Sequence, residues 1–211
     1  YGKVSSYIEG TPIAKKLNEQ GISAFVLYYR IKEKALYPAP MDDLARAVRY
    51  TQENATKYNL DQSNYSIWGS SAGGHLAASF GTENMGYLKF DLPRPKVIVL
   101  AYPVISMEKH MSHQGTRNRL IGEDANAEME EFTSIEKHIT KSFPPVFIWC
   151  GENDQTVNPE NTRMMEAALK EAGVPVCAKI FKNASHGIGP GTGTDAEGWI
   201  RDAVEFWIMQ K

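Results

Sequence analysis

Apolar runs and amphipathic stretches alternate along the first half of the chain. Ser23 to Ile31 (SAFVLYYRI) is apolar, aromatic and β-branched, which is typical of a strand buried on both faces of a parallel sheet. Tyr65 to Gly69 (YSIWG) is a shorter run of the same kind. Gly10 to Gln20 and Met41 to Asn59 instead place apolar residues at helical spacing. The pattern predicts helix, strand, helix and strand, in that order.

The same alternation continues in the second half. Apolar runs predict strands at Lys96 to Pro103, Pro145 to Gly151 and Val174 to Phe181, and amphipathic patterns predict helices at Pro159 to Ala172 and Asp195 to Met209. Strands that alternate with helices imply crossover connections between parallel neighbours. The predicted fold class is therefore α/β, a mostly parallel sheet with helices on both faces.

One segment departs from this alternation. Ser106 to Ser142 is rich in His, Glu and Lys, and only Glu128 to His138 has an amphipathic pattern. We predict an insertion at about residues 106–142 that lies over the edge of the sheet where the strands end, and such insertions often shape a substrate pocket. A solvated connector is the alternative.

Length and charge narrow the classes of protein. The 211 residues are sufficient for one domain, residues 1–211, and a formal net charge of −2 offers no basic surface for nucleic acid. No run approaches the ~18 apolar residues that a membrane span needs. Cys150 and Cys177 have no metal-binding spacing and are expected to be reduced core residues. No metal or organic cofactor is implied.

A short motif introduces the candidate chemistry. Gly69-Ser70-Ser71-Ala72-Gly73 matches G-x-S-x-G, follows a predicted strand and precedes a predicted helix at His75 to Phe80. This context favours a tight turn that lifts Ser71 above the sheet as a nucleophile. The backbone N–H of Ala72 would then face a developing oxyanion at the start of the helix. Ser70 is a candidate substrate-binding residue. An ordinary Gly- and Ser-rich turn is the alternative.

A serine nucleophile needs a general base, and His186 is the best candidate among five histidines. It lies in a loop of small residues, Asn183 to Gly187, between the last predicted strand and the last predicted helix. His75 is expected to be a packing residue. The remaining histidines belong to the polar insertion and could be merely solvated; they are His110, His113 and His138.

The base in turn needs a residue that orients it, and Asp154 follows the predicted strand Pro145 to Gly151 at a strand end, where open α/β sheets place their sites. The chain order Ser, Asp, His is that of α/β hydrolases. An Asp that only forms a turn is the alternative, and Glu152 is the fallback. Asp42 and Asp43 are expected to favour a helix N-terminus.

Five stretches together resemble the carbohydrate-esterase-like α/β hydrolases, the group of acetyl-xylan esterases and hormone-sensitive-lipase-like esterases. They are EGTPIAKKLNEQGISAFVLYYR, YPAPMDDLARAVRY, IWGSSAGGHLAASFGT, FPPVFIWCGENDQTVNPEN and ASHGIG, in the order of that family. The resemblance implies a catalytic triad of Ser71, Asp154 and His186. It also implies short acyl esters, often of sugars, as substrates.

Members of this family carry a Gly-rich segment whose backbone helps to bind the oxyanion. Tyr1 resembles the last residue of a P-G-G-G-Y segment and is a second candidate for the oxyanion site. The resemblance implies that glycines and N-terminal strands lie upstream, and that one strand belongs between Ser23 to Ile31 and Tyr65 to Gly69. We therefore expect either a gap in the sheet at that position or a substitute strand.

The predicted function is that of a serine carboxylic ester hydrolase, acting on a small-molecule or oligosaccharide ester through an acyl-enzyme. A peptidase or thioesterase of the same fold is the alternative among enzymes. A binding protein of this fold, without catalysis, is the alternative of another class. The oligomeric state is open. The compartment is also open, with the cytoplasm favoured over secretion.

Overall fold

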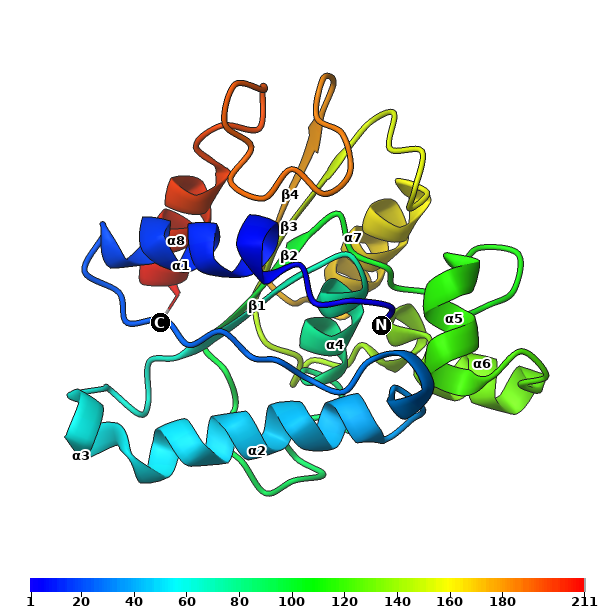
Figure 1. The fold of residues 1–211 in the computed structure, drawn as a ribbon, viewed down its shortest axis with the longest axis horizontal. Coiled ribbons are helices and arrows are strands. Elements are labelled where there is room, and N and C mark those ends of the chain that lie inside the picture. Colours follow the sequence, from blue (N-terminus) through cyan, green and yellow to red (C-terminus); the bar gives the residue numbers. More distant parts are fainter. Residues whose placement is uncertain (211) are drawn as a thin grey trace.

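A parallel sheet forms the centre of the molecule. The structure, a computed structural model, describes residues 1–210, and Lys211, the end of the predicted domain, lies outside this range. The sheet has four strands in chain order: β1 (Ser66–Ser70), β2 (Val97–Ala101), β3 (Val146–Gly151) and β4 (Val176–Phe181) (Figure 1). The last three lie within their predicted runs, and β1 begins and ends one residue later than predicted. The predicted fold class is confirmed.

Both faces of the central strands are buried. In β2, Ile98 and Leu100 belong to the apolar cluster on one face, whereas Val97 and Val99 belong to the cluster on the other face. Successive side chains of a strand point to opposite faces, so an uninterrupted apolar run supplies two cores. This alternation explains why residues 97–101 contain no polar side chain.

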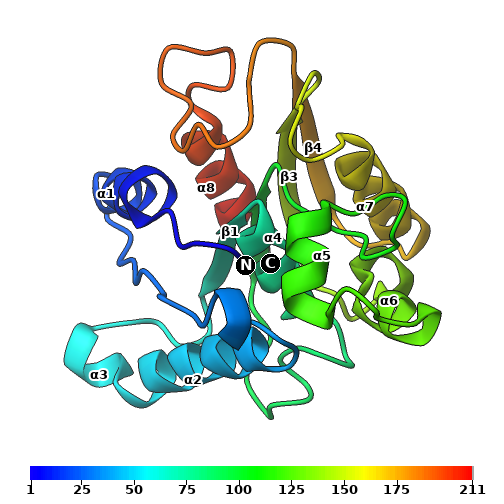
Figure 2. The ribbon, with the colours of Figure 1, turned by 45° about the vertical axis from the view of Figure 1, so that its right-hand side comes forward.

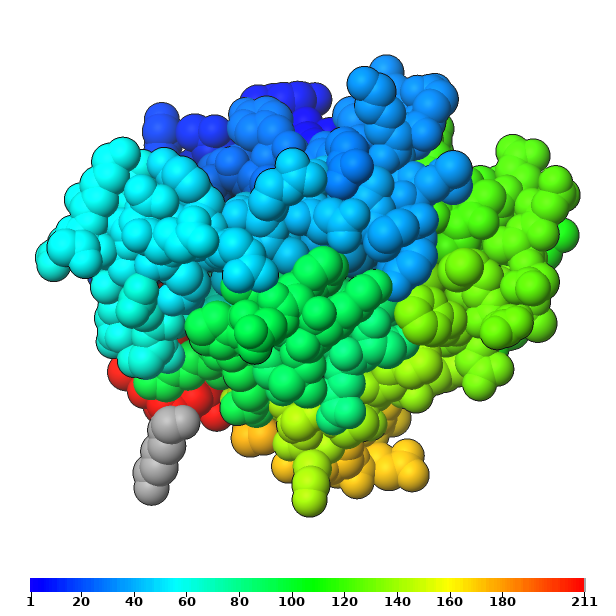
Figure 3. All heavy atoms as spheres, turned by 90° about the horizontal axis from the view of Figure 1, so that it is seen from below, coloured from blue at the N-terminus to red at the C-terminus, as the bar shows by residue number. Residues whose placement is uncertain are grey.

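Helices cover the two faces of the sheet. The first cluster contains residues of α2 (Ala39–Glu53), α4 (Ala72–Ser79) and α7 (Glu160–Glu171), and the second contains residues of α1 (Thr11–Asn18) and α8 (Trp199–Met209). Seen from below, α2 and the connection after α4 form much of the surface (Figure 3). No helix within residues 1–210 has the length and apolar character needed to traverse a bilayer.

The helices differ from their predicted bounds by a few residues, and two of the differences have a clear local cause. The predicted helix Met41 to Asn59 is divided into α2 and α3 (Ala55–Tyr58) at Asn54, and Asn59 ends α3 in a left-handed conformation at φ 52°. Asn adopts this conformation more readily than most residues. The last helix begins at Trp199 because the preceding residues form turns, which include Gly198 at φ 93°.

The predicted strand Ser23 to Ile31 is wrong. This segment is extended but forms no strand, and its recorded backbone partners are side chains or other segments, as in the bond from Arg30 N–H to the Asp43 carboxylate at 2.8 Å. Phe25 and Tyr28 are 50% and 68% exposed. An apolar run becomes a strand only when a neighbouring backbone pairs with it, and no strand of residues 1–210 lies alongside.

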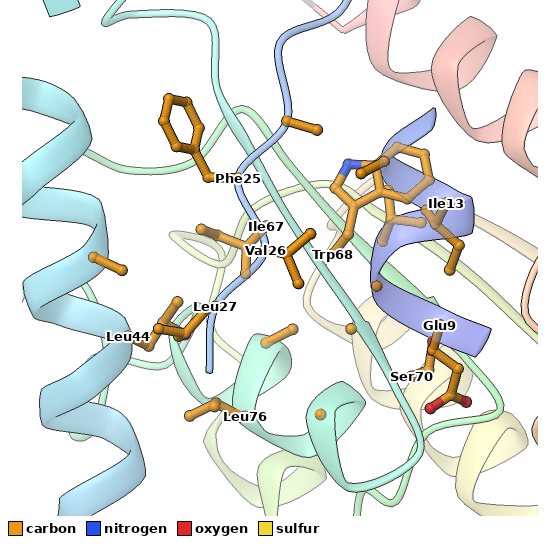
Figure 4. Close-up of a pocket in the computed structure, with 18 of the residues that line it drawn as sticks. Glu9, Ile13, Phe25, Val26, Leu27, Leu44, Ile67, Trp68, Ser70 and Leu76 are labelled. Carbon is orange, nitrogen blue, oxygen red and sulfur yellow. The ribbon is translucent and has the colours of Figure 1, made fainter. Parts of the chain in front are cut away.

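A cavity of about 1330 Å³ lies between this segment and the free edge of β1. Val26 and Leu27 of the segment and Ile67 and Trp68 of β1 are among the residues that line it (Figure 4). Figure 2 shows the same separation in the ribbon, with the connection from α1 to α2 running apart from β1. This space lies beside β1, where a gap was expected, but because Ser23 to Ile31 forms no strand it lies beyond the edge of a contiguous four-stranded sheet and not within the sheet. That residues upstream of Tyr1 supply a strand stays a prediction.

The segment Ser106 to Ser142 contains more helix than its sequence predicts. It forms α5 (Gln114–Ile121), α6 (Ala127–Thr133) and the 3-10 turn η3 (Ile135–His138). Arg117 connects these elements, because its buried guanidinium donates to Glu130 Oε1 at 2.5 Å and to the carbonyl of Gly122 at 3.1 Å. Some charged side chains of this segment therefore form hydrogen bonds within it and do not face solvent.

His75 of α4 joins this segment to the core, and it lies buried as predicted. Its Nε2 lies 2.8 Å from the carbonyl of Thr133 and must donate to it, so Nδ1 accepts the Tyr1 hydroxyl at 2.8 Å. Burial lowers the pKa of His75 from 6.5 to about 4, although the bond to Thr133 opposes this. The imidazole is therefore neutral near pH 7.

We predict that stability falls as the pH drops from 6.5 towards 4. In this window the unfolded chain protonates His75 whereas the native protein does not, so protonation favours unfolding by about 2 kcal/mol at pH 5. Urea unfolding at pH 7.5 and pH 5 measures the change. A His75→Gln variant is the control: it is less stable at pH 7.5 but loses less between the two pH values. Equal losses in both proteins would contradict the prediction.

Candidate active site

Ser71 lies on a strained turn between β1 and α4. Its backbone has φ 54° and ψ −122°, a conformation that costs a non-glycine residue about 1–3 kcal/mol. Bonds to the end of β2 hold it there, because Ser71 N–H donates to the Ala101 carbonyl at 3.0 Å and Val104 N–H donates to the Ser71 carbonyl at 3.1 Å. The turn therefore presents the Ser71 side chain above the sheet.

Close packing explains two glycines around this turn. A Cβ on Gly69 would lie 2.1 Å from the Gly73 carbonyl oxygen, and a Cβ on Gly74 would lie 2.6 Å from the Pro103 Cβ. A Cβ on Gly73 itself would meet nothing closer than the Tyr29 hydroxyl at 3.7 Å. Packing therefore does not require glycine at position 73, the second glycine of the motif. It does require glycine at the next position, Gly74.

His186 lies in the loop that follows β4, as predicted. Its Nε2 is 2.9 Å from Ser71 Oγ and its Nδ1 is 2.7 Å from Asp154 Oδ2. The loop passes against the end of β3, where a Cβ on Gly151 would lie 1.9 Å from the Ala184 carbonyl oxygen. The close approach of these two segments brings His186 to Asp154 across the sheet edge.

Asp154 makes both kinds of contact that its sequence position left open: its carboxylate forms a turn, and it also faces the predicted base. Its Oδ1 accepts the backbone N–H groups of Thr156 at 2.8 Å and Val157 at 3.0 Å, which makes a turn, while Oδ2 faces His186. Burial by itself raises the pKa of Asp154, but the hydrogen bonds from His186 and these N–H groups outweigh it, so the pKa is lowered. The fallback Glu152 is exposed and makes no recorded contact with His186.

These contacts fix the tautomer of the neutral imidazole. An ionised Asp154 can only accept, so His186 Nδ1 carries the proton and Nε2 has a lone pair for the Ser71 hydroxyl. Ser71, Ala72 and His186 line the large cavity beside β1, so the hydroxyl is open to a ligand. The arrangement can remove the proton from Ser71 as its oxygen attacks an electrophile.

The other predicted site residues also line this cavity. Ala72 is the first residue of α4, where backbone N–H groups have no partner within the helix. Ser70 ends β1 near Glu9 (Figure 4). Tyr1 is almost fully buried, and its ring packs edge-on against Tyr29 at 5.9 Å. The roles of Ala72, Ser70 and Tyr1 stay predictions.

Sequence reasoning missed residues of the polar segment that reach the cavity. His113 begins α5: its Nδ1 accepts the Thr116 N–H at 3.2 Å, and it lines the cavity together with Thr116 and Arg119. Burial lowers the pKa of His113, and the charges of His186 and Arg119 lower it further. No feature of the sequence distinguishes His113 from the exposed His110. The two histidines differ in burial because of how α5 packs.

A second, polar cavity of about 450 Å³ adjoins the first. It lies between residues 110–113 and the loop after β3, and its walls include Asn153, Asp154 and Gln155. His113 and Thr156 line both cavities, so the two spaces adjoin at these residues. Within residues 1–210, no three His, Cys, Asp or Glu side chains lie together as a metal site would need.

A parallel sheet that carries Ser after β1, Asp after β3 and His after β4, in this chain order, defines an α/β hydrolase. The BD-FAE family model matches residues 2–169, and the chain belongs to this family. An acetyl ester-xyloside bifunctional hydrolase from Caldicellulosiruptor lactoaceticus has a similar structure, with a TM-score of 0.87 and 32% identity over 98% of this chain and 78% of that one. The predicted family resemblance is confirmed.

Two related proteins have similar names. Endo-1,4-beta-xylanase B of Butyrivibrio fibrisolvens is 32% identical over 201 residues, which cover 90% of this chain and 31% of that protein. An acetylxylan esterase of Xylanibacter ruminicola is 28% identical over 200 residues, which cover 91% of this chain and 40% of that protein. The chain therefore spans less than half the length of these two relatives.

The glycines of the turn give a testable contrast. We predict that Gly74→Ala, whose Cβ would lie 2.6 Å from Pro103, lowers the free energy of unfolding by about 1–3 kcal/mol, the usual cost of overpacking. Gly73→Ala is the matched control one position away in the same helix, and it should be neutral or stabilising because alanine favours helix. Urea unfolding of the two variants checks this. Equal destabilisation by both would contradict the packing argument.

Proposed function

We propose that this protein is a serine carboxylic ester hydrolase that removes short acyl groups, such as acetyl, from carbohydrates. The observation that carries the proposal is the hydrogen-bonded line from Ser71 through His186 to Asp154, at 2.9 Å and 2.7 Å, on the wall of an open cavity. In this proposal Ser71 is the nucleophile, His186 the general base and Asp154 the residue that orients His186. A small-molecule or oligosaccharide ester is the substrate.

The reaction proceeds in two acyl transfers. Ser71 Oγ attacks the ester carbonyl carbon while its proton moves to His186 Nε2, and the carbonyl oxygen becomes an oxyanion. The C–O bond to the alcohol then breaks, and His186 gives the proton to the departing alcohol oxygen. Water attacks the acyl-serine in the same way, which releases the carboxylic acid and restores Ser71. Asp154 keeps the imidazole in one tautomer throughout.

The start of α4 supports the oxyanion. The N–H of Ala72 belongs to the first turn of this helix, where the peptide dipoles and free N–H groups favour negative charge. One such donor is worth about 10²–10³ in rate in serine hydrolases. A second donor from the backbone of Tyr1 is part of the proposal, because Tyr1 lines the same cavity.

Two observations favour a carbohydrate as the alcohol. The related proteins include a xylanase, an acetylxylan esterase and an acetyl ester-xyloside bifunctional hydrolase. The second cavity, which shares His113 and Thr156 with the cavity that His186 lines, is walled mainly by polar residues, which suit the hydroxyl groups of a sugar better than an acyl chain. The leaving alcohol must lie near His186, which protonates it.

We predict that Ser71→Ala and His186→Ala each reduce kcat for an aryl acetate by at least about 10⁴-fold, since neither leaves an activated nucleophile. Asp154→Asn keeps the shape but disturbs the tautomer, and a loss of about 10⁴ is the precedent for this change. Labelling by a fluorophosphonate probe should occur in the parent protein and be absent in Ser71→Ala. Glu152→Gln is the matched control, with activity unchanged. Unaltered turnover in Ser71→Ala or His186→Ala would refute the proposed mechanism.

We further predict that Gln155→Ala raises KM for acetylated xylo-oligosaccharides by about 2–10-fold, the worth of one hydrogen bond, and leaves KM for an aryl acetate unchanged. Gln20→Ala is the control, an exposed glutamine that lines neither cavity. Equal effects on the two substrates would argue against a sugar in the polar cavity. Faster turnover of thioesters or peptides than of acetyl esters would exclude the carbohydrate substrate.

A further inference from the structure

Tyr102 is a buried aromatic residue in direct contact with the predicted base. It follows β2 immediately, and its ring centroid lies 4.7 Å from that of His186 at an interplanar angle of 57°. On another side the ring packs edge-on against Trp149, with centroids 4.9 Å apart. The Trp149 contact holds the ring, so the ring limits how far the His186 imidazole can move towards the sheet.

The hydroxyl of Tyr102 joins two further segments. It donates to Glu9 Oε1 at 2.7 Å and accepts the backbone N–H of Gly189 at 3.2 Å. A carboxylate without a proton can only accept, so Glu9 fixes the direction of the hydroxyl hydrogen and leaves the oxygen lone pairs for Gly189. Burial, together with the neighbouring Glu9, raises the pKa of Tyr102, which keeps the hydroxyl protonated.

Gly189 lies three residues after His186 in the same loop. Its carbonyl accepts the indole N–H of Trp199 at 3.0 Å, so both of its backbone polar groups are held by buried aromatic side chains. A Cβ on Gly189 would lie 2.3 Å from the carbonyl oxygen of Ile8 in the turn η1 (Ser6–Gly10), which also carries Glu9. Three segments therefore meet at one hydroxyl: η1, the end of β2 and the loop of His186.

The backbone of Tyr102 is unusual as well. Its φ is 38°, a value at which a bulky side chain is strained by about 1–3 kcal/mol, and its N–H donates to the Trp149 carbonyl at 2.6 Å. Strain of this kind persists where the surrounding structure fixes it, often near functional sites. Here the strained backbone points the ring at His186 and the hydroxyl at its loop.

We propose that Tyr102 is a positioning residue for His186 and that Glu9 acts through it by ordering the hydroxyl. The proposal rests on the proposed function of His186 as general base. Packing alone does not account for the hydroxyl, because phenylalanine would fill the same space without a polar atom to satisfy. The hydroxyl holds the loop at Gly189, so that the bond between His186 and Ser71 is formed before substrate binds.

The test compares Tyr102→Phe with Tyr87→Phe in the full chain. Tyr87 is the matched control, a buried tyrosine whose hydroxyl donates to the Ser142 carbonyl at 3.2 Å, away from the site. Tyr102→Phe should lower kcat for an aryl acetate about tenfold, as expected for one lost hydrogen bond at the transition state, and change KM less than twofold. Tyr87→Phe should leave both constants unchanged while lowering Tm by a similar amount. Unchanged kcat in Tyr102→Phe would overturn the proposal, as would a rise in KM alone.

Glu9 provides a second, independent variant. Glu9→Gln should lower kcat in the parent protein but have no further effect in the Tyr102→Phe background, because its action passes through the hydroxyl. Additive losses would overturn the proposed role of Glu9. If Tyr102→Phe does not fold, Glu9→Gln carries the test by itself, with a lower kcat at unchanged KM as the supporting result and unchanged kcat as the opposing one.

A spectroscopic measurement separates this proposal from the proposed function. The proton on His186 Nδ1, bonded to Asp154 at 2.7 Å, should give a downfield resonance in protein with 15N-labelled histidine. The resonance should shift or broaden in Tyr102→Phe and stay unchanged in Tyr87→Phe; no difference between these variants would overturn the positioning role. An inactive parent protein would refute the proposed function, whereas the resonance would still decide whether Tyr102 positions His186.

Discussion

The backbone conformation of Ser71 is the constraint on which the site depends. At φ 54° and ψ −122° this residue is strained, and it is held because the end of β2 supplies hydrogen bonds on both of its sides. Gly69 and Gly74 are needed because the turn brings β1, α4 and the segment after β2 closer than a Cβ allows. The sheet thus stabilises a turn that would be unfavourable in a free peptide.

The ends of neighbouring strands bring the remaining side chains to this turn. Asp154 follows β3 and His186 follows β4, and parallel strands that lie in chain order deliver both to one edge of the sheet. The loop of His186 has no regular secondary structure, so its position depends on contacts such as Gly151 against Ala184 and Gly189 against Tyr102. Precision at the site therefore comes from backbone packing around the loops as much as from the strands.

The polar segment Ser106 to Ser142 shows how composition can mislead. Its composition predicted an insertion over the sheet edge, with a solvated connector as the alternative, and gave no sign that Arg117 would be buried and satisfied by Glu130 and backbone carbonyls. The resulting packing of α5 brings His113 to the junction of two cavities. Burial of a charged side chain requires partners distant in the sequence, and hydrophobic periodicity carries no information about them.

The sequence by itself determined the alternation of strands and helices and four of the five predicted strands, because periodicity, strand ends and turn glycines are local features. The same features proposed Ser71, Asp154 and His186 as partners, and the structure places these side chains within hydrogen-bond distance of one another. Only the tertiary structure decided that Ser23 to Ile31 is not a strand, since pairing depends on a neighbouring backbone and not on composition. It also decided that Gly74 rather than Gly73 is tightly packed and that Tyr102 lies against His186. These features arise where segments far apart in the chain come within a few ångströms, and no local pattern encodes that approach.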